Sequence, residues 1–303
     1  YLVKTNGAII SVPAITVPGY ILLDNSCLGC ATAITPSTAA TNGAAITITG
    51  ALSAGSLAGS TGVTINAVAN GSGVGFTQGA NAISSLAGGV TITANSQTGI
   101  AYSSTGNITA TGQAITITGT STTAASISDT GTINGGAVTL VGTQSTSTAT
   151  ATPITATGLI TANSLTVTGT GGASTTIVSL GAMTINAGGG NITVTANNAA
   201  AGTNVGITQT GVITDNAVGS NISFTSNNDI DQNGAITLVA NTGTAPANIT
   251  YNTTAGNNTS IITAAALSVT GTSTSAINYL VKTNGAIISV PAITVPGYIL
   301  LDN

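Results

Sequence analysis

Short segments in which Ile, Val or Leu alternates with Thr or Ser recur along the whole chain. They start at residues 90, 115, 138, 165, 192 and 222, at nearly even intervals. Strict alternation of apolar and polar residues predicts a half-buried β-strand. Recurrence at nearly even intervals therefore predicts an all-β fold assembled from repeating units.

Each interval between these segments has room for additional short strands. Residues 99–102 and 107–110 alternate in the same way between the segments at 90 and 115, and Gly, Asn and Ser doublets separate them as turns. About three short strands per coil of roughly 25 residues is typical of a parallel β-helix, or β-solenoid, in which stacking buries Ile, Val and Leu in continuous ladders. An antiparallel β-sandwich array is the alternative.

The beginning of the chain is repeated at its other end. Residues 1–25 (YLVKTNGAIISVPAITVPGYILLDN) recur without a substitution as residues 279–303, an offset of 278; we call these segments the two terminal copies. We interpret residues 1–278 as one tandem repeat period of about 10–11 coils and residues 279–303 as the start of the next; an artificial duplication is the alternative. With coils about 4.8 Å apart, one period would be about 50 Å long.

Charged residues are almost absent. The chain has 2 Lys+Arg, 6 Asp+Glu (all of them Asp) and no His, and 3% of its residues are charged, against roughly 25% in an ordinary domain. Without His there is no imidazole base and no His-ligated metal. Without a basic surface, nucleic-acid binding is not expected. We therefore expect neither an enzyme nor a nucleic-acid-binding protein.

The apolar content is high enough for a folded core. Hydrophobic residues make up 42% of the chain and the mean hydropathy is +0.48, whereas disordered chains combine low hydrophobicity with high net charge. The longest apolar run, residues 8–23, is interrupted by Ser11, Pro13 and Pro18. A membrane-spanning helix needs about 20 apolar residues, so no membrane span is expected in this sequence.

Two segments resemble a known class of protein. Residues 229–238 (DIDQNGAITL) and 181–187 (GAMTINA) are similar to the coils of filamentous-haemagglutinin-type exoproteins and related bacterial β-strand-repeat surface proteins. The resemblance is one of pattern and composition, and it extends over nearly the whole chain. It implies a right-handed β-solenoid that is extracellular, either secreted or displayed on the cell surface, and that acts as an adhesin, stalk or fibre.

An identical repeat of such a long period is more polymer-like than a typical adhesin shaft. We therefore expect a structural subunit of an extracellular filament or giant cell-surface adhesin. Its partners would be copies of itself, end to end and possibly side by side, and a host or neighbouring surface. The alternative is a solenoid shaft that binds a ligand: ice through a threonine face, calcium, or a glycan.

Cys27 and Cys30 are the two cysteines of the chain. Ala31 follows them where a haem-attachment motif would have His, and there is no second cysteine pair to complete a zinc site. A local disulfide between Cys27 and Cys30 is the preferred interpretation. A cross-link to a neighbouring fibre, a redox centre and a metal site remain alternatives.

Residues 229–234 match the opening of a calcium-binding loop. Asp229, Asp231 and Asn233 would offer oxygen ligands at alternate positions, and Gly234 would allow the turn. The acid that normally completes such a loop is replaced by Ala240. The alternative is a strand with two outward Asp that ends in an Asn-Gly turn. Calcium is the one cofactor considered. Asp229 and Asp231 as a hydrolytic carboxylate pair would lack the usual cationic or aromatic neighbours.

Pairs of Thr separated by one residue recur at 47/49, 91/93, 116/118, 166/168 and 193/195. Stacked in register, they would form an uncharged face of methyl and hydroxyl groups, similar to that of ice-binding solenoids. The alternative is that Thr simply fills the outer positions of strands, where its branched Cβ is favoured. The coils differ in length, with the shortest interval from 115 to 138 and the longest from 192 to 222, which argues against an ice-binding face.

Several Asn residues are followed two positions later by Ser or Thr, which is the acceptor pattern for N-glycosylation. The cluster formed by Asn248, Asn252, Asn257 and Asn258 is the best candidate for a sugar-bearing loop. Asn107, Asn191 and Asn221 share the pattern, which is expected by chance in a chain so rich in Asn, Ser and Thr.

Overall fold

The computed structural model describes residues 1–26, 43–55, 57, 59–172, 176–198, 205–254, 261–283 and 287–303. Within these ranges all regular secondary structure is β-strand, and the strands of each sheet pair in parallel. The one antiparallel pair in the described part of the chain is the isolated bridge between Asn6 and Ser26. The predicted parallel β-helix is confirmed, and the antiparallel sandwich is wrong.

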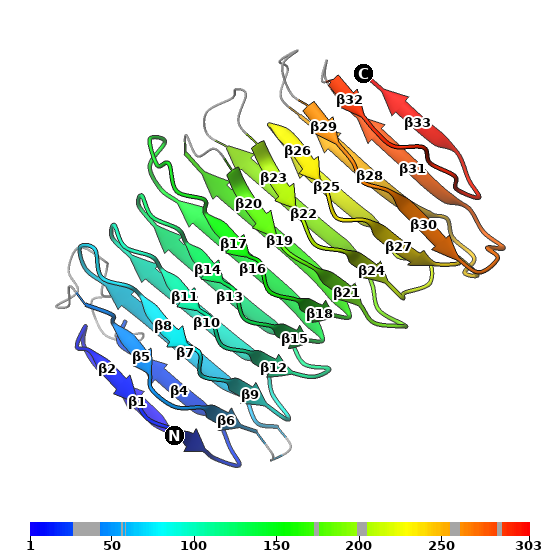
Figure 1. Ribbon diagram of the computed structural model, residues 1–303. Helices are drawn as coiled ribbons and strands as arrows, with labels where there is room; N and C mark the ends of the chain where they lie inside the picture. The colour runs from blue at the N-terminus through cyan, green and yellow to red at the C-terminus, as the bar shows by residue number, and fades with distance from the viewer. Residues whose placement is uncertain are drawn as a thin grey trace.

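The strands form three sheets, and every third strand in the sequence belongs to the same sheet over most of the chain (Figure 1). Sheet one has twelve strands: β1 (Leu2–Lys4), β4 (Ile21–Asp24), β7 (Val63–Ala69), β10 (Val90–Ser96), β13 (Ile115–Ser121), β16 (Ala137–Gln144), β19 (Ser164–Gly171), β22 (Ile192–Asn198), β25 (Ile222–Ser226), β28 (Ala247–Thr253), β31 (Ile277–Lys282) and β33 (Ile299–Asp302). It contains the longest strands, and each coil of the chain adds one strand to it.

Sheets two and three have shorter strands. Sheet two has eleven: β2 (Ile10–Val12), β5 (Ile46–Ile48), β8 (Phe76–Gly79), β11 (Tyr102–Ser104), β14 (Ile127–Asp129), β17 (Ile154–Ala156), β20 (Thr176–Leu180), β23 (Val205–Gln209), β26 (Asp229–Gln232), β29 (Ile261–Thr263) and β32 (Ile287–Ser289). Sheet three has ten: β3 (Ile15–Thr16), β6 (Leu52–Ala54), β9 (Ile83–Ser85), β12 (Ile108–Ala110), β15 (Ile133–Gly135), β18 (Ile160–Ala162), β21 (Met183–Ile185), β24 (Ile213–Asp215), β27 (Ile236–Val239) and β30 (Leu267–Thr270).

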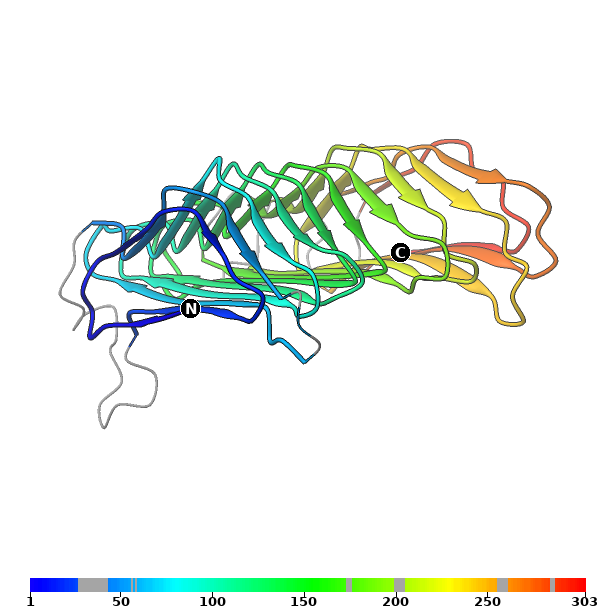
Figure 2. The ribbon, with the colours of Figure 1, turned by 90° about the horizontal axis from the view of Figure 1, so that it is seen from below.

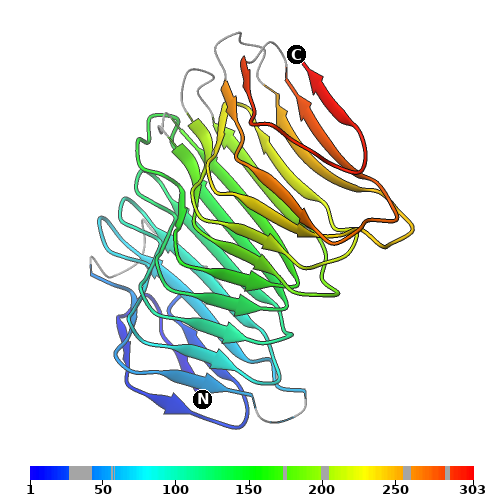
Figure 3. The ribbon, with the colours of Figure 1, turned by 45° about the vertical axis from the view of Figure 1, so that its right-hand side comes forward.

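The coils lie one behind another along a single axis, with the two chain ends at opposite ends of the solenoid (Figures 1 and 2). A turned view shows the strands of successive coils side by side from one end to the other (Figure 3). The described residues contain no helix long and apolar enough to cross a membrane.

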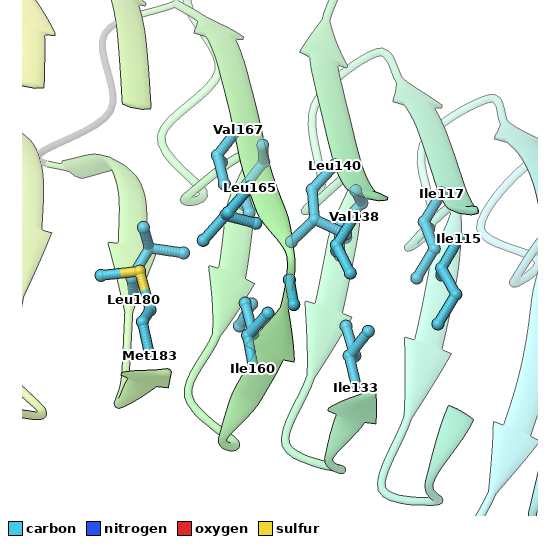
Figure 4. Packing of buried hydrophobic residues seen from close by; sticks show 14 of the residues in the cluster. Ile115, Ile117, Ile133, Val138, Leu140, Ile160, Leu165, Val167, Leu180 and Met183 are labelled. Atoms are coloured by element: carbon cyan, nitrogen blue, oxygen red, sulfur yellow. The ribbon is translucent and has the colours of Figure 1, made fainter. Parts of the chain in front are cut away.

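The core is built from ladders of equivalent apolar residues. Ile117 pairs with Leu140, and Leu140 pairs with Val167, on three consecutive strands of sheet one. All three side chains are buried and lie in one row (Figure 4). Because side chains alternate between the two faces of a strand, the residues on either side of each of these three, along its own strand, point outward. One coil cannot enclose such a row by itself, so burial requires stacking.

Aromatic rings also stack in the interior. The ring centroids of Phe76 and Tyr102 are 5.7 Å apart, and those of Phe224 and Tyr251 are 5.4 Å apart. Tyr279 continues the second stack at 5.6 Å from Tyr251. Fully buried side chains of this size fit because each ring lies on the ring of the next coil, which is a favourable arrangement for aromatic pairs. Aromatic residues are rare in the sequence, yet these five belong to the core.

Buried glutamines satisfy the hydroxyl groups of two of these tyrosines. The Tyr102 hydroxyl donates a hydrogen bond to Gln78 Oε1 at 2.7 Å, and the Tyr251 hydroxyl donates to Gln232 Oε1 at 2.9 Å. Gln78 and Gln232 are themselves fully buried. A buried polar group without a partner would be destabilising, so these pairs allow a polar aromatic residue to serve as core.

The two terminal copies pair their strands in the same register. In the first copy, Leu2 pairs with Leu22 and Lys4 pairs with Asp24. In the second copy, the equivalent pairs are Leu280 with Leu300 and Lys282 with Asp302. The copies differ at their middle strands: β2 begins at Ile10 whereas β32 begins at Ile287, the equivalent of Ile9, and no described strand in the second copy corresponds to β3.

Candidate functional site

The outer surface of sheet one carries a regular array of threonines, which we call the threonine face. It consists of three equivalent outward positions on each of five consecutive strands, β10, β13, β16, β19 and β22: Thr91, Thr93, Asn95, Thr116, Thr118, Thr120, Thr139, Val141, Thr143, Thr166, Thr168, Thr170, Thr193, Thr195 and Asn197. Twelve of the fifteen are Thr, and none is charged. All are at least partly exposed.

The threonine face is ordered in two directions. Thr91, Thr116 and Thr139 are paired across consecutive strands, and the column continues through Thr166 and Thr193. The register is continuous along these five strands. Neighbouring strands are about 4.8 Å apart, and alternate residues along a strand are about 6.7 Å apart. Since Thr is restricted at χ1, the hydroxyl and methyl groups are held on a nearly regular grid.

The variation in coil length does not disturb this grid. The step from Ile115 to Val138 is the shortest of the series and the step from Ile192 to Ile222 is the longest, yet both pairs are in register. The extra residues lie in the connections between strands, while parallel backbone hydrogen bonds fix the sheet. The expectation that uneven coils would exclude a regular threonine face is therefore wrong.

One of the predicted Thr pairs lies elsewhere. Thr47 is on β5, which belongs to sheet two, and Thr49 follows the end of that strand. The pairs at 91/93, 116/118, 166/168 and 193/195 are all on sheet one. Alternation alone cannot tell which of the three sheets a strand joins, so the sequence pattern overestimates the length of the face at this end.

Two of the predicted calcium ligands lie on an extended strand, and the third comes directly after it. Asp229 and Asp231 are partly exposed on β26, and Ile230 between them is buried. The Asn233 backbone N–H donates to the Gln209 carbonyl at 2.7 Å, and a side chain at Gly234 would collide with the Gly211 carbonyl oxygen.

Calcium normally takes six to eight oxygen ligands that a curved loop gathers around it. Alternate side chains of an extended strand are instead spread along one face. Among the described residues, no group of three or more His, Cys, Asp or Glu side chains lies together. The segment is a strand that ends in a bend at Gly234. The calcium site stays a prediction that this geometry does not favour.

The remaining predicted sites fall partly outside the described residues. Cys27 and Cys30, the predicted disulfide, and Asn257 and Asn258, two predicted glycosylation sites, lie there. Asn248 and Asn252 are on β28, both partly exposed. Glycosylation at these positions stays a prediction.

Asparagines on successive coils form a hydrogen-bonded stack that we call the asparagine ladder: Asn191, Asn221, Asn248 and Asn278. The Asn221 N–H donates to Asn191 Oδ1 at 2.8 Å, and the Asn248 N–H donates to Asn221 Oδ1 at 2.9 Å. The side-chain amides continue the stack, with Asn248 Nδ2 at 3.1 Å from Asn221 Oδ1 and Asn278 Nδ2 at 3.0 Å from Asn248 Oδ1.

The asparagine ladder explains a pattern that the sequence alone assigned to chance or to sugar attachment. Asn191, Asn221 and Asn248 each precede an Ile and a Ser or Thr because they stand just before, or at the start of, a strand of sheet one. A sugar on Asn248 would modify the Nδ2 atom that donates to Asn221. An Asn that recurs at the start of successive strands is the sequence signal from which this stack could have been predicted.

Three carboxylates are buried: those of Asp24, Asp129 and Asp215. Asp129 is 1% exposed; its Oδ1 accepts a hydrogen bond from the Gly131 N–H at 2.8 Å, and its Oδ2 has no partner. Burial raises the pKa of Asp129 to about 7, although the hydrogen bond from Gly131 opposes that shift. Burial likewise raises the pKa of the neighbouring Tyr102 hydroxyl, and the charge of Asp129 adds to this effect.

Asp215 is also buried, and burial raises its pKa. The Ser220 hydroxyl and the Ala217 N–H donate hydrogen bonds to it, which lower the pKa in part. Asp129 is on β14 of sheet two and Asp215 is on β24 of sheet three, several coils away, so the two do not form a carboxylate pair. Both are the third residue of a strand that begins with a buried Ile, an inward position that alternation could have identified.

No protein-family model matches the sequence, and neither a curated protein nor a solved structure matches it. The fold is therefore established by the strand pairing itself. The likeness to filamentous-haemagglutinin-type proteins remains a resemblance in sequence pattern.

Proposed function

We propose that this chain is a structural, non-catalytic segment of an extracellular filament or giant cell-surface adhesin built from tandem β-solenoid periods. The observation that supports this most directly is the shared register of the two terminal copies. Leu2 with Leu22 and Leu280 with Leu300 are the same pair, at opposite ends of the solenoid. Because the coils at the two ends have the same sequence and the same strand pairing, one period can be followed by another without a change in that pairing.

The burial of the two copies is complementary. In the first copy, Ile21 and Leu23 are fully buried because β7 packs beyond them. In the second copy, the equivalent Ile299 and Leu301 are 46% and 48% exposed. Conversely, the side of the coil that is open in the first copy is packed against β28 in the second. Joining one period to the next would cover both sides of every such coil.

The arrangement suits a mechanical role. Backbone hydrogen bonds between coils run along the axis, so that tension is shared by the bonds of three sheets at each step. Tandem repetition would extend the length of the molecule while leaving its cross-section unchanged. The low charge leaves little electrostatic repulsion between neighbouring fibres. We propose copies of the same period, joined end to end, as the main partners, with a host or neighbouring surface as the target of an adhesin.

Immunogold labelling of intact source cells tests this proposal. Antibodies raised against the folded 1–303 chain should label filaments or long projections outside the cell before any permeabilisation. Labelling that appears only after the envelope is opened would overturn the proposal. An antibody against a cytoplasmic protein serves as the control for cell integrity.

A further inference from the structure

We propose that the threonine face binds ice. This inference goes beyond a structural role, and it does not depend on where the fibre is located. Its basis is the one extended surface of the described solenoid on which a single side-chain type repeats in two directions: twelve Thr at fifteen positions of five strands.

The grid has the two-dimensional regularity that binding to a crystal surface requires. Columns such as Thr116, Thr139 and Thr166 repeat with the strand spacing of about 4.8 Å. Along each strand, neighbours such as Thr166 and Thr168 repeat at about 6.7 Å. Both distances are of the same size as the repeats of oxygen positions on the faces of hexagonal ice. A flexible or irregular surface could not match a crystal over many sites, whereas an in-register parallel sheet is fixed by its hydrogen bonds.

The chemistry of the grid is also suitable. Each Thr offers a hydroxyl that donates and accepts hydrogen bonds, beside a methyl group around which water orders. Val141 replaces one Thr with a residue of the same branched shape. No charged side chain stands among the fifteen positions. A charge would hold its own hydration shell and would disrupt an ordered water layer.

The other two sheets do not offer such a grid. On the same coils, sheet two presents a single outward column through Ser103, Ser128 and Thr155. Sheet three presents a column through Thr109, Asn134 and Thr161. These strands are short, which leaves one outward side chain each. Sheet one therefore differs from its neighbours in both width and uniformity.

Other occupants fit the threonine face less well. It carries no charge that would attract an ion or a charged polymer, and it contains no aromatic ring on which a sugar would stack. A second copy of the chain, packed face to face, is the remaining physical option. That option predicts a concentration-dependent dimer, and it is separated from ice binding by the experiment below.

Ice partition of the 1–303 chain tests the proposal. Ice grown slowly from a dilute solution should take up the protein, whereas a non-binding globular protein is excluded, and the solution should show thermal hysteresis. Thr168→Lys places a charge in the middle column of the face and should reduce uptake at least tenfold, to the level of the non-binding protein. Thr161→Lys is the matched control: it lies on the strand that immediately precedes β19 in the chain, is also half-buried and faces outward from sheet three, and it should retain uptake.

The melting temperatures of the three proteins should agree; if Thr168→Lys lowers its own, Thr195→Lys in the same column replaces it. Exclusion of the unmodified chain from ice would overturn the proposal, as would equal uptake by both variants. A dimer in sedimentation that Thr168→Lys abolishes, without ice uptake, would also overturn it and would assign the face to a second copy. None of these results depends on the cell-surface labelling that tests the proposed function.

Discussion

Tyr1 and Tyr279 are the same residue of the two terminal copies, yet Tyr1 is 48% exposed whereas Tyr279 is fully buried. The difference is the coil that precedes each. The ring of Tyr279 packs on Tyr251, and its backbone pairs with Ile249 on β28. Tyr1 contacts the coil that follows it but lacks that support. A preceding period would bury Tyr1 as Tyr279 is buried.

Gly131 stands at the corner between sheets two and three, where coils approach one another through bare backbone. A Cβ at Gly131 would collide with the carbonyl oxygen of Gly106 on the coil before, and one at Gly158 would collide with the carbonyl oxygen of Gly131. Gly131→Ala should therefore push two coils apart and cost about 1 to 3 kcal/mol of unfolding free energy. Urea unfolding followed by circular dichroism measures the loss.

The matched control is Gly19→Ala, where an added Cβ would meet nothing within 4 Å. It should leave the unfolding midpoint within the error of the measurement. If Gly131→Ala and Gly19→Ala behaved alike, the close approach of the coils at this corner would be disproved.

Asn221 occupies the middle of the asparagine ladder. Its Oδ1 accepts hydrogen bonds from the backbone N–H and the side chain of Asn248, and its own amide donates to Asn191. Asn221→Ala removes these side-chain bonds and leaves the Asn248 N–H without its acceptor, so it should cost about 1 to 3 kcal/mol. Asn197→Ala, an exposed outward position on β22, should cost much less. Equal losses in thermal or urea unfolding would show that the ladder is not stabilising.

Asp129 should make the stability of the solenoid depend on pH. Its pKa is raised from 3.8 to about 7 by burial, so the folded state keeps a proton that the unfolded state releases near pH 4. The free energy of unfolding is therefore highest below about pH 4 and falls as the pH rises to 7, by up to about 4 kcal/mol, before levelling off. Asp215, whose pKa is also raised, changes stability in the same direction.

Asp129→Asn removes the buried charge and keeps an acceptor for Gly131, so it should flatten most of this pH dependence and raise stability at pH 8. Ser128→Asn, the outward neighbour on the same strand, should leave the pH dependence unchanged. Urea midpoints between pH 4 and pH 8 provide the measurement. An unmodified protein that is more stable at pH 8 than at pH 4 would contradict the assignment.

Alternation in the sequence was sufficient to identify six consecutive strands of sheet one, β10 to β25, and the faces of their side chains. In Val90–Ser96 every second residue is buried, as the pattern predicts. The same alternation places Asp129 inward, two residues after the buried Ile127. Alternation could not assign Thr47 to a sheet, since it is the same in all three.

Side-chain contacts between coils could not be predicted from the sequence. The bonds of the asparagine ladder join residues 27 to 30 positions apart, and each depends on a register that backbone pairing sets. The regular spacing of the threonine face also depends on backbone pairing. The extra residues of the longer coils lie in the connections, so the strands themselves stay in register. The geometry of the Asp229–Gly234 motif has a related cause: the neighbouring coils hold Asp229–Gln232 as a strand, whereas a calcium loop is curved.

The period formed by residues 1–278 should be repeatable along one axis. Ten strand-to-strand steps separate β1 from β31 in sheet one, which corresponds to about 48 Å. A chain that carries residues 1–278 twice, followed by residues 279–303, can be compared with the 1–303 chain by small-angle X-ray scattering and negative-stain microscopy. We expect a particle that is longer by this distance and has an unchanged cross-section. A particle of unchanged length and larger cross-section would show that the two periods lie side by side and do not stack along one axis.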